Sequence, residues 1–304
     1  MTYFNQLSAA TTDVVRILTA KGVYAHHVKF GGPGVPPARA PRAPTDARSE
    51  FLANRAMGDW AENLLAASLR TACPEWQISH FGETNSIAAG HQDFKAHYLN
   101  GLEEVRLHGK RPDLLIFPRN QPPGVAENLS TLPFNELDQI ANSAIASIEV
   151  RSSKFEALTY MAMRAQQREA GGKPSRDAPS FTVKVEDLVI VYRWLERKKI
   201  PQAYFQVFFD SVFAINVLEI FRLIGGGLDL RNGIVIEKPA NSQEKSTIMI
   251  PITFGTQVGA IATPPEFAAE HKVTELGRHD AYVKPVGGKL ELNDAAVKAI
   301  LLGV

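Results

Sequence analysis

Residues 107–117 read LHGKRPDLLIF, and this segment sets the architecture at the middle of the chain. Gly109-Lys-Arg111 is typical of a turn. It is followed by Pro112-Asp113 and then by the apolar run Leu114-Leu-Ile-Phe117, which predicts a buried strand. Asp113 therefore stands at the mouth of a strand whose other residues belong to a core. The alternative is that Asp113 only caps the turn.

The next strong strand pattern lies at residues 144–150, AIASIEV, and continues into Arg151. Side chains alternate along a strand, so Glu149 and Arg151 share one face with Ser147 and Ser153, while the apolar residues between them point into a core. Burying a carboxylate beside a guanidinium has a desolvation cost that folding alone does not require. The pair favours a chemical role, and a structural ion pair is the alternative.

Outward from these strands, the patterns predict an α/β protein with a small mixed sheet flanked by helices. Helical spacing of apolar residues predicts helices over residues 5–22, 49–72, 155–169, 186–198, 216–224 and 293–302. Further strands are predicted over 77–81, 203–209, 234–236, 246–252 and 258–262, with 212–215 as a hairpin partner or continuation of 203–209, and 118–135 as a loop.

Three regions follow from these patterns. Residues 1–48 hold an N-terminal helix and an arm with five prolines, which forbid regular structure. Residues 49–224 form the core. A glycine run at 225–227 predicts a hinge before a β-rich C-terminal subdomain, residues 225–304. Arg39 and Arg42 lie on the arm, which either wraps a DNA backbone or is a solvated linker.

Bulk composition excludes several classes of protein. The chain has 304 residues, a formal net charge of +1 and 21% charged residues, so no overall basic field indicates nucleic acid. A single cysteine, Cys73, rules out an internal disulfide framework or zinc cluster. No signal peptide and no membrane-spanning apolar run is present, so we expect a cytoplasmic protein with no membrane partner. Serine-hydrolase, Walker, HExxH and nicotinamide motifs are also missing.

Phosphodiester hydrolysis gives a reason for acids on two neighbouring strands. Mg²⁺ prefers oxygen ligands and keeps several waters, so Asp113 and Glu149 could hold it against a phosphate. Glu62, on the helix predicted over 49–72, is a third candidate ligand, or simply an exposed helix residue. Arg151 or Lys154 would stabilise the charged transition state. His26, His27 and His80 have no second ligand at metal-binding spacing, so they are interpreted as surface or hydrogen-bonded histidines.

Pro112-Asp113 followed by Glu149-Val-Arg151 resembles the PD-(D/E)XK nuclease motif, and Glu62 in Gly58-Asp-Trp-Ala-Glu62 stands where many members carry another acid. Residues 181–187, running on to Trp194, and residues 204–210 are similar to type II restriction endonucleases of the AccI-like kind. The resemblance spans roughly residues 49–224. It implies a restriction-endonuclease-like core, Mg²⁺, double-stranded DNA as substrate and products with 5′-phosphate ends.

The motif's usual lysine is Arg151 here. Arginine binds phosphate but does not deprotonate, so a general-base role is doubtful and Arg151 would act as an electrostatic clamp. Lys154, three residues later, is the alternative source of an ammonium group. The departure also leaves open a decayed protein that binds DNA without cutting it.

The sequence therefore predicts a type II restriction endonuclease of a restriction-modification system, working as a homodimer because palindromic sites mirror two-fold symmetry. A repair or recombination nuclease on the same core is the alternative, beside the decayed protein. Ser153 would contact phosphate or serve a turn, and Gln206 would reach the active site or pack in the core. Candidate base readers are Arg231, Asn232, Lys238, Asn241, Gln243 and Lys245.

Overall fold

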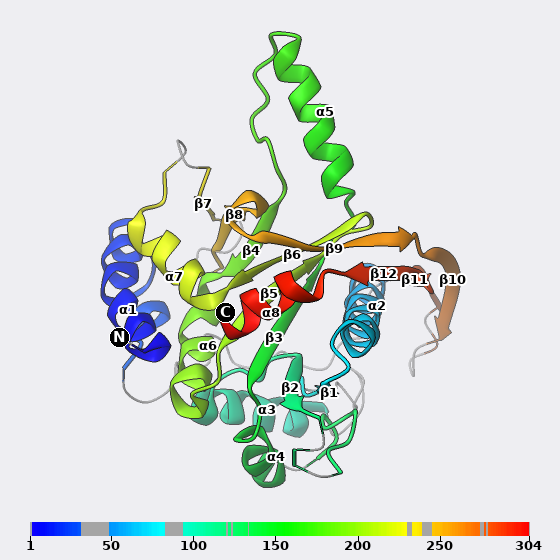
Figure 1. The fold of residues 1–304 in the computed structure, drawn as a ribbon. Helices are drawn as coiled ribbons and strands as arrows, with labels where there is room; N and C mark the ends of the chain where they lie inside the picture. Colours follow the sequence, from blue (N-terminus) through cyan, green and yellow to red (C-terminus); the bar gives the residue numbers. More distant parts are fainter. Residues whose placement is uncertain are drawn as a thin grey trace.

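A computed structural model describes residues 2–31, 49–82, 94–119, 121–122, 124–132, 134–229, 233–238, 245–273, 277 and 279–303. The helices are α1 (Tyr3–Ala20), α2 (Ser49–Ala72), α3 (Phe94–His108), α4 (Phe134–Ala141), α5 (Ala157–Glu169), α6 (Val185–Lys198), α7 (Val217–Gly226) and α8 (Asp294–Leu302) (Figure 1). The strands are β1 (Trp76–His80), β2 (Leu114–Pro118), β3 (Ala146–Ser152), β4 (Ser180–Lys184), β5 (Gln202–Val207), β6 (Ser211–Asn216), β7 (Val235–Glu237), β8 (Thr247–Pro251), β9 (Thr256–Thr263), β10 (Glu266–Val273), β11 (His279–Val286) and β12 (Lys289–Leu292).

The centre of the molecule is a seven-stranded mixed sheet in the order β1-β2-β3-β5-β6-β9-β12. Strands β3 and β5 run parallel, because α5, β4 and α6 form the crossover between them, and the other described neighbours are antiparallel. The two predicted strands at its centre, β2 and β3, are hydrogen-bonded neighbours. A mixed sheet flanked by helices agrees with the predicted α/β class.

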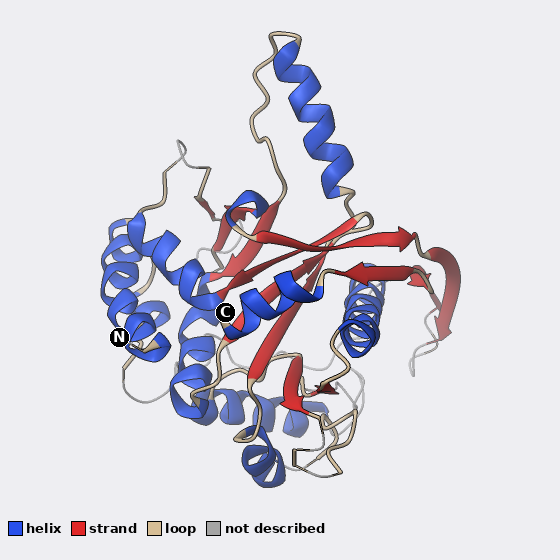
Figure 2. Cartoon of the chain, in the orientation of Figure 1, coloured by secondary structure: helices blue, strands red, loops and turns tan. Residues whose placement is uncertain are grey.

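Helices cover both faces of this sheet (Figure 2). Strand β2 needs cover on both faces, because its alternate side chains enter two different hydrophobic cores. Leu115 and Phe117 pack with buried residues of α1, α6 and α7, whereas Leu114 and Ile116 pack with α2 and α8. A strand buried on both faces reads as a continuous apolar run, which is what residues 114–117 are.

Two smaller sheets complete the fold. Strands β4, β8 and β7 form one, and β10 and β11 form a two-stranded ribbon that packs on α2. Residues after 225 contribute β9 and β12 to the central sheet, and β8 pairs with β4. The sheets therefore cross the predicted boundary at residue 225, and the division into domains stays a prediction.

Several elements were not predicted, namely α3, α4, β4, β10, β11 and β12. Helix α4 begins at Phe134, inside the segment predicted as loop. The last proline of that segment is Pro133, so no proline interrupts a helix that starts after it. Within the described residues, no helix has the length and apolar character needed to cross a membrane.

Candidate active site

Asp113 and Glu149 lie opposite one another where β2 begins. Leu114 is paired with Ile148 in the antiparallel register, so the preceding residue, Asp113, faces Glu149. The backbone N–H of Val150 donates a hydrogen bond to Asp113 Oδ2 over 2.6 Å, which ties the carboxyl group of one strand to the backbone of the other. The two predicted acids therefore converge.

The end of β1 holds Asp113 from the other side. The backbone N–H groups of Phe81 and Gly82 donate to the Asp113 carbonyl oxygen over 2.8 and 3.2 Å. A Cβ atom at Gly82 would lie 3.3 Å from both Asp113 Cα and Asp113 Oδ1. The glycine therefore leaves room beside the carboxylate.

Glu149 is almost fully buried, with a side chain only 1% exposed. Its Oε1 atom contacts the ammonium group of Lys110 and lies 3.1 Å from Arg151 Nη2. Its Oε2 atom is buried and has no hydrogen-bond partner among the described residues. A buried carboxylate oxygen without a donor is costly, so this atom is poised to take a further ligand.

Lys110 reaches Glu149 because the turn before it packs tightly on α6. Gly109 has φ +87°, and a Cβ atom there would lie 2.5 Å from the Ile190 carbonyl oxygen, so glycine is required. The N–H of Lys110 donates to that same oxygen over 3.0 Å. Asp187, in the first turn of α6, completes the group at 3.8 Å from Lys110 Nζ and 3.3 Å from Arg151 Nη2.

Both cations stay protonated in this network. Burial lowers the pKa of Lys110, but the carboxylates of Glu149 and Asp187 outweigh it and raise the pKa above its ordinary value. The pKa of Arg151 is raised in the same way, chiefly by Glu149 against desolvation. The guanidinium of Arg151 also lies 5.8 Å from the ring centroid of Tyr204, which burial and Glu149 keep un-ionised by raising its pKa.

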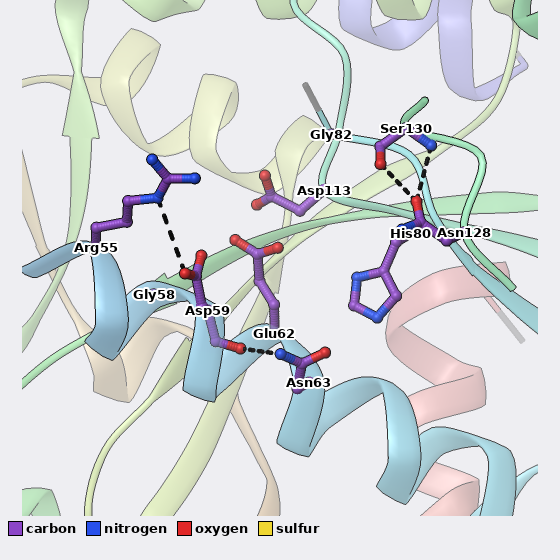
Figure 3. A pocket seen from close by; sticks show the side chains of 10 residues that line it. All are labelled: Arg55, Gly58, Asp59, Glu62, Asn63, His80, Gly82, Asp113, Asn128 and Ser130. Carbon is purple, nitrogen blue, oxygen red and sulfur yellow. Dashed lines mark hydrogen bonds and ion pairs between the residues drawn. The ribbon is translucent and has the colours of Figure 1, made fainter. Parts of the chain in front are cut away.

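A cavity of about 470 Å³ opens beside Asp113. In Figure 3 the carboxyl groups of Asp113 and Glu62 point toward one another, the latter from α2. The cavity is lined by Arg55, Gly58, Asp59, Glu62, Asn63, His80, Gly82, Asp113, Asn128 and Ser130.

The carboxyl groups at this cavity resist ionisation. Burial and the charges of Asp59 and Glu149 raise the pKa of Glu62 to about 7. Burial and the charge of Glu149 raise the pKa of Asp113 well above its usual range, although Lys110 opposes this. If all of these carboxyl groups were ionised, their negative charge would exceed that of the two cations, and a bound cation would relieve the repulsion.

The donor set suits a hard divalent ion. Within the described part of the chain, no three His, Cys, Asp or Glu side chains are grouped closely enough to form a metal site by themselves. Mg²⁺ does not need three, because it is usually held by one or two carboxylates with waters and substrate phosphate. Asp113 and the free Oε2 of Glu149 supply such a pair.

A family model described as AccI restriction endonuclease matches residues 1–173 and 168–303 of the chain. The chain belongs to the AccI restriction endonuclease family. The resemblance read from residues 181–194 and 204–210 is thereby confirmed at the level of this family. Membership implies a site-specific nuclease that binds DNA. Comparisons with curated proteins and with solved structures gave no significant match.

The other residues that the sequence predicted for the site of this AccI-family chain lie on or after strands β3 and β5. Gln206 is buried opposite Arg151 in the β3–β5 register, and its Oε1 has no hydrogen-bond partner among the described residues. Ser153 follows β3 and donates its N–H to the Val207 carbonyl. Lys154 is exposed beyond the end of β3, whereas the cations that contact Glu149 are Lys110 and Arg151.

Most of the residues predicted to contact DNA, whether its backbone or its bases, lie outside the part of the chain that the structure describes. Arg39, Arg42, Arg231, Asn232, Asn241 and Gln243 lie outside the described residues. The ammonium group of Lys238 donates to the carbonyl oxygen of Lys21, at the end of α1. Lys245 is exposed just before β8. Their role in DNA recognition stays a prediction.

Sequence reasoning missed Lys110 and Asp187. Lys110 lies three residues before Asp113, in a turn that the sequence marks only by its glycine. Asp187 lies in the segment that carries the family resemblance, but its partners come from β3 and from the turn before β2. The signal that could have identified Lys110 is the side-by-side arrangement of β2 and β3, which brings the start of one strand to the acid of the other.

Proposed function

We propose that this protein is a Mg²⁺-dependent type II restriction endonuclease with a PD-(D/E)XK-type centre, which hydrolyses phosphodiester bonds at specific sites in double-stranded DNA. The observation that carries the proposal is the placement of Asp113 opposite Glu149, with Lys110 and Arg151 on the same carboxylate. Membership of the AccI restriction endonuclease family supplies the substrate class.

Asp113 and Glu149 would hold the metal ion, and Glu62 would bind a second ion or orient a water from the cavity side. When bound, Mg²⁺ neutralises charge on the phosphate and lowers the pKa of its water. Val150 fixes the orientation of the Asp113 carboxyl through its backbone N–H, so one oxygen of that group is committed and the other remains for a ligand.

Lys110 and Arg151 would stabilise the negative charge that grows on the phosphate. Both have raised pKa values, so neither gives up its proton near neutral pH, and we assign them electrostatic roles rather than general-base roles. Asp187 would keep the two cations in place between the carboxylates. We therefore propose Lys110, rather than Lys154, as the source of the ammonium group that the motif lysine would supply.

We further propose products with 5′-phosphate ends and a two-fold dimer on palindromic DNA, both of which rest on the family resemblance. Sedimentation equilibrium of the full chain with and without DNA tests the dimer. A mass of one chain without DNA, and of one chain plus one duplex with DNA, contradicts the dimer.

The activity is tested by incubating the pure protein with phage-length DNA in Mg²⁺ or in EDTA. We expect discrete fragments in Mg²⁺ alone, with none from Asp113→Asn, which keeps the side chain's size. Cuts confined to branched or damaged DNA would indicate a repair enzyme, and binding without cutting would indicate a decayed one. Either result overturns the proposal.

A further inference from the structure

Helix α5 projects from the body of the molecule as an arm (Figure 1). The arm, defined as residues 154–178 and described throughout, consists of α5 and the segment that returns to β4. Ala157 is the one buried residue in this 13-residue helix. A helix of this length is marginal in water without a packed face, so the arm gains little from folding alone.

The arm is nevertheless fixed at both ends. Asp210, in the β5–β6 turn, accepts hydrogen bonds from the backbone N–H groups of Ala157, Leu158 and Thr159 over 2.7 to 3.2 Å. At the other end, the N–H of Ile252 donates to the Pro179 carbonyl oxygen over 2.9 Å. The arm therefore has a defined base rather than a free hinge.

The arm starts next to the candidate active site. Five residues, 152–156, separate Arg151 from the first residue of α5. Arg151 contacts Glu149, so a DNA phosphate at that carboxylate would lie near the strand end from which the arm leaves. A duplex seated there extends well beyond the site, and an arm projecting from its edge is placed to follow the backbone.

The charge of the arm sets it apart from the remainder of the chain. It carries five basic and three acidic residues, a formal net charge of +2, while the whole chain has +1, so all other residues together sum to −1. The basic residues are Lys154, Arg164, Arg168, Lys173 and Arg176.

Local contacts hold part of this charge at the surface. The guanidinium of Arg164, a partly exposed residue, lies 4.7 Å from the Tyr160 ring centroid and donates a hydrogen bond to Gln167 Oε1 over 2.7 Å. Arg168 is paired with Asp177 but its side chain is still 60% exposed, and Lys173 at the tip is exposed. Cations set along an exposed helix match the phosphate backbone of DNA, which attracts Lys and Arg without regard to sequence.

We propose that the arm of residues 154–178 binds the phosphate backbone of duplex DNA beside the cleavage site. This inference rests on the proposed function, since DNA must lie at Glu149 for the arm to reach it. Its contribution is sequence-independent affinity, made through Arg164 and Lys173 in particular, rather than recognition of bases.

The test compares two double variants of the full chain. Arg164→Gln with Lys173→Gln removes two charges from the arm, and Arg16→Gln with Lys21→Gln removes two from exposed positions on and just after α1. Dissociation constants for a random-sequence 40-base-pair duplex are measured in Ca²⁺ over a range of salt. The arm variant should reduce the slope of log affinity against log salt by about 2 and weaken binding roughly tenfold relative to the α1 variant.

A second measurement needs no variant. Trypsin cleaves after exposed Lys and Arg, and duplex DNA should slow cleavage in the arm while leaving cleavage at Arg16 and Lys21 unchanged. Equal affinity of the two variants, or arm cleavage unaffected by DNA, overturns the inference. A change in the arm variant's molecular mass in place of its DNA affinity also overturns it, because a second copy of the chain would then be the partner.

The arm and the proposed function can fail separately. If the wild-type protein cuts DNA in Mg²⁺ while both double variants bind alike, the arm inference alone is wrong. If the wild-type protein neither binds nor cuts duplex DNA, the proposed function is wrong and the arm inference falls with it.

Discussion

Glu149 and Asp210 are two carboxylates, the first on β3 and the second in the turn between β5 and β6, and their oxygen atoms are satisfied in opposite ways. Asp210 accepts four hydrogen bonds, three from the N-terminus of α5 and one from the Ser211 hydroxyl. Glu149 has two cations on one oxygen and no described partner on the other. A saturated carboxylate stabilises the fold, while an incompletely paired one retains capacity for a ligand.

The largest effect on activity is expected from Glu149→Gln. Loss of the anion should reduce cleavage at saturating DNA by about a thousandfold or more, because the metal ligand and the partner of both cations disappear together. The melting temperature in EDTA should fall, because Lys110 and Arg151 lose a buried counter-ion, although the repulsion on Asp113 is relieved. Cleavage within tenfold of wild type would show that Glu149 is as structural as Asp210.

The second largest effect is expected at the cations of this group. Lys110→Met should lower cleavage about a hundredfold, because one positive charge near the phosphate is lost. Arg151→Lys keeps the charge and should retain most activity, which separates an electrostatic role from a proton-transfer role. The rate is measured at several pH values, and a changed pH optimum in Arg151→Lys would contradict the assignment.

The residues changed in these two experiments differ in whether the sequence alone predicted them. Asp113 and Glu149 were predictable, because an acid on a strand flanked by apolar residues stands out by its alternation with the core. Lys110 was not, because its side chain is brought to Glu149 by a contact between a turn and α6. A pattern within one segment carries no information about such a contact.

The fold shows the same limit. The helices with a clear apolar stripe, α1, α2 and α6, were predicted within a few residues. The ribbon β10–β11 was missed, because one of its faces packs on α2 while the other exposes Phe267 and Val283, so its alternation of polar and apolar residues is lost. The extension of the central sheet by β9 and β12 depends on pairing between distant segments, which periodicity does not specify.

A third prediction concerns pH. Burial, Asp59 and Glu149 raise the pKa of Glu62 to about 7 in the folded protein, against about 4.5 when it is unfolded. A carboxyl with a raised pKa favours folding below pH 4.5, and that contribution is lost as pH rises through 7. In EDTA, the wild type should lose on the order of 2 kcal/mol more stability than Glu62→Gln between pH 5 and pH 8. Urea unfolding at both pH values measures this, and parallel losses would refute it.

The smallest effect is expected from Asp210→Ala. Removing the acceptor at the start of α5 should lower the free energy of unfolding by about 1–2 kcal/mol, as loss of a helix N-terminal acceptor does. The cleavage rate at saturating DNA should stay within a fewfold of wild type, because no cation or metal ligand is touched. A large fall in that rate, with stability preserved, would remove the distinction between the two carboxylates.

Divalent-ion binding shows whether Glu149 and Asp113 share a metal ion. Mn²⁺ is titrated into wild-type protein, Glu149→Gln and Asp210→Ala with a random-sequence duplex present, and free Mn²⁺ is followed by its electron paramagnetic resonance signal. Wild type and Asp210→Ala should bind the ion alike, while Glu149→Gln should lose the site. Equal binding by all three would mean that Glu149 and Asp113 do not share a metal ion, and the proposed chemistry would be wrong.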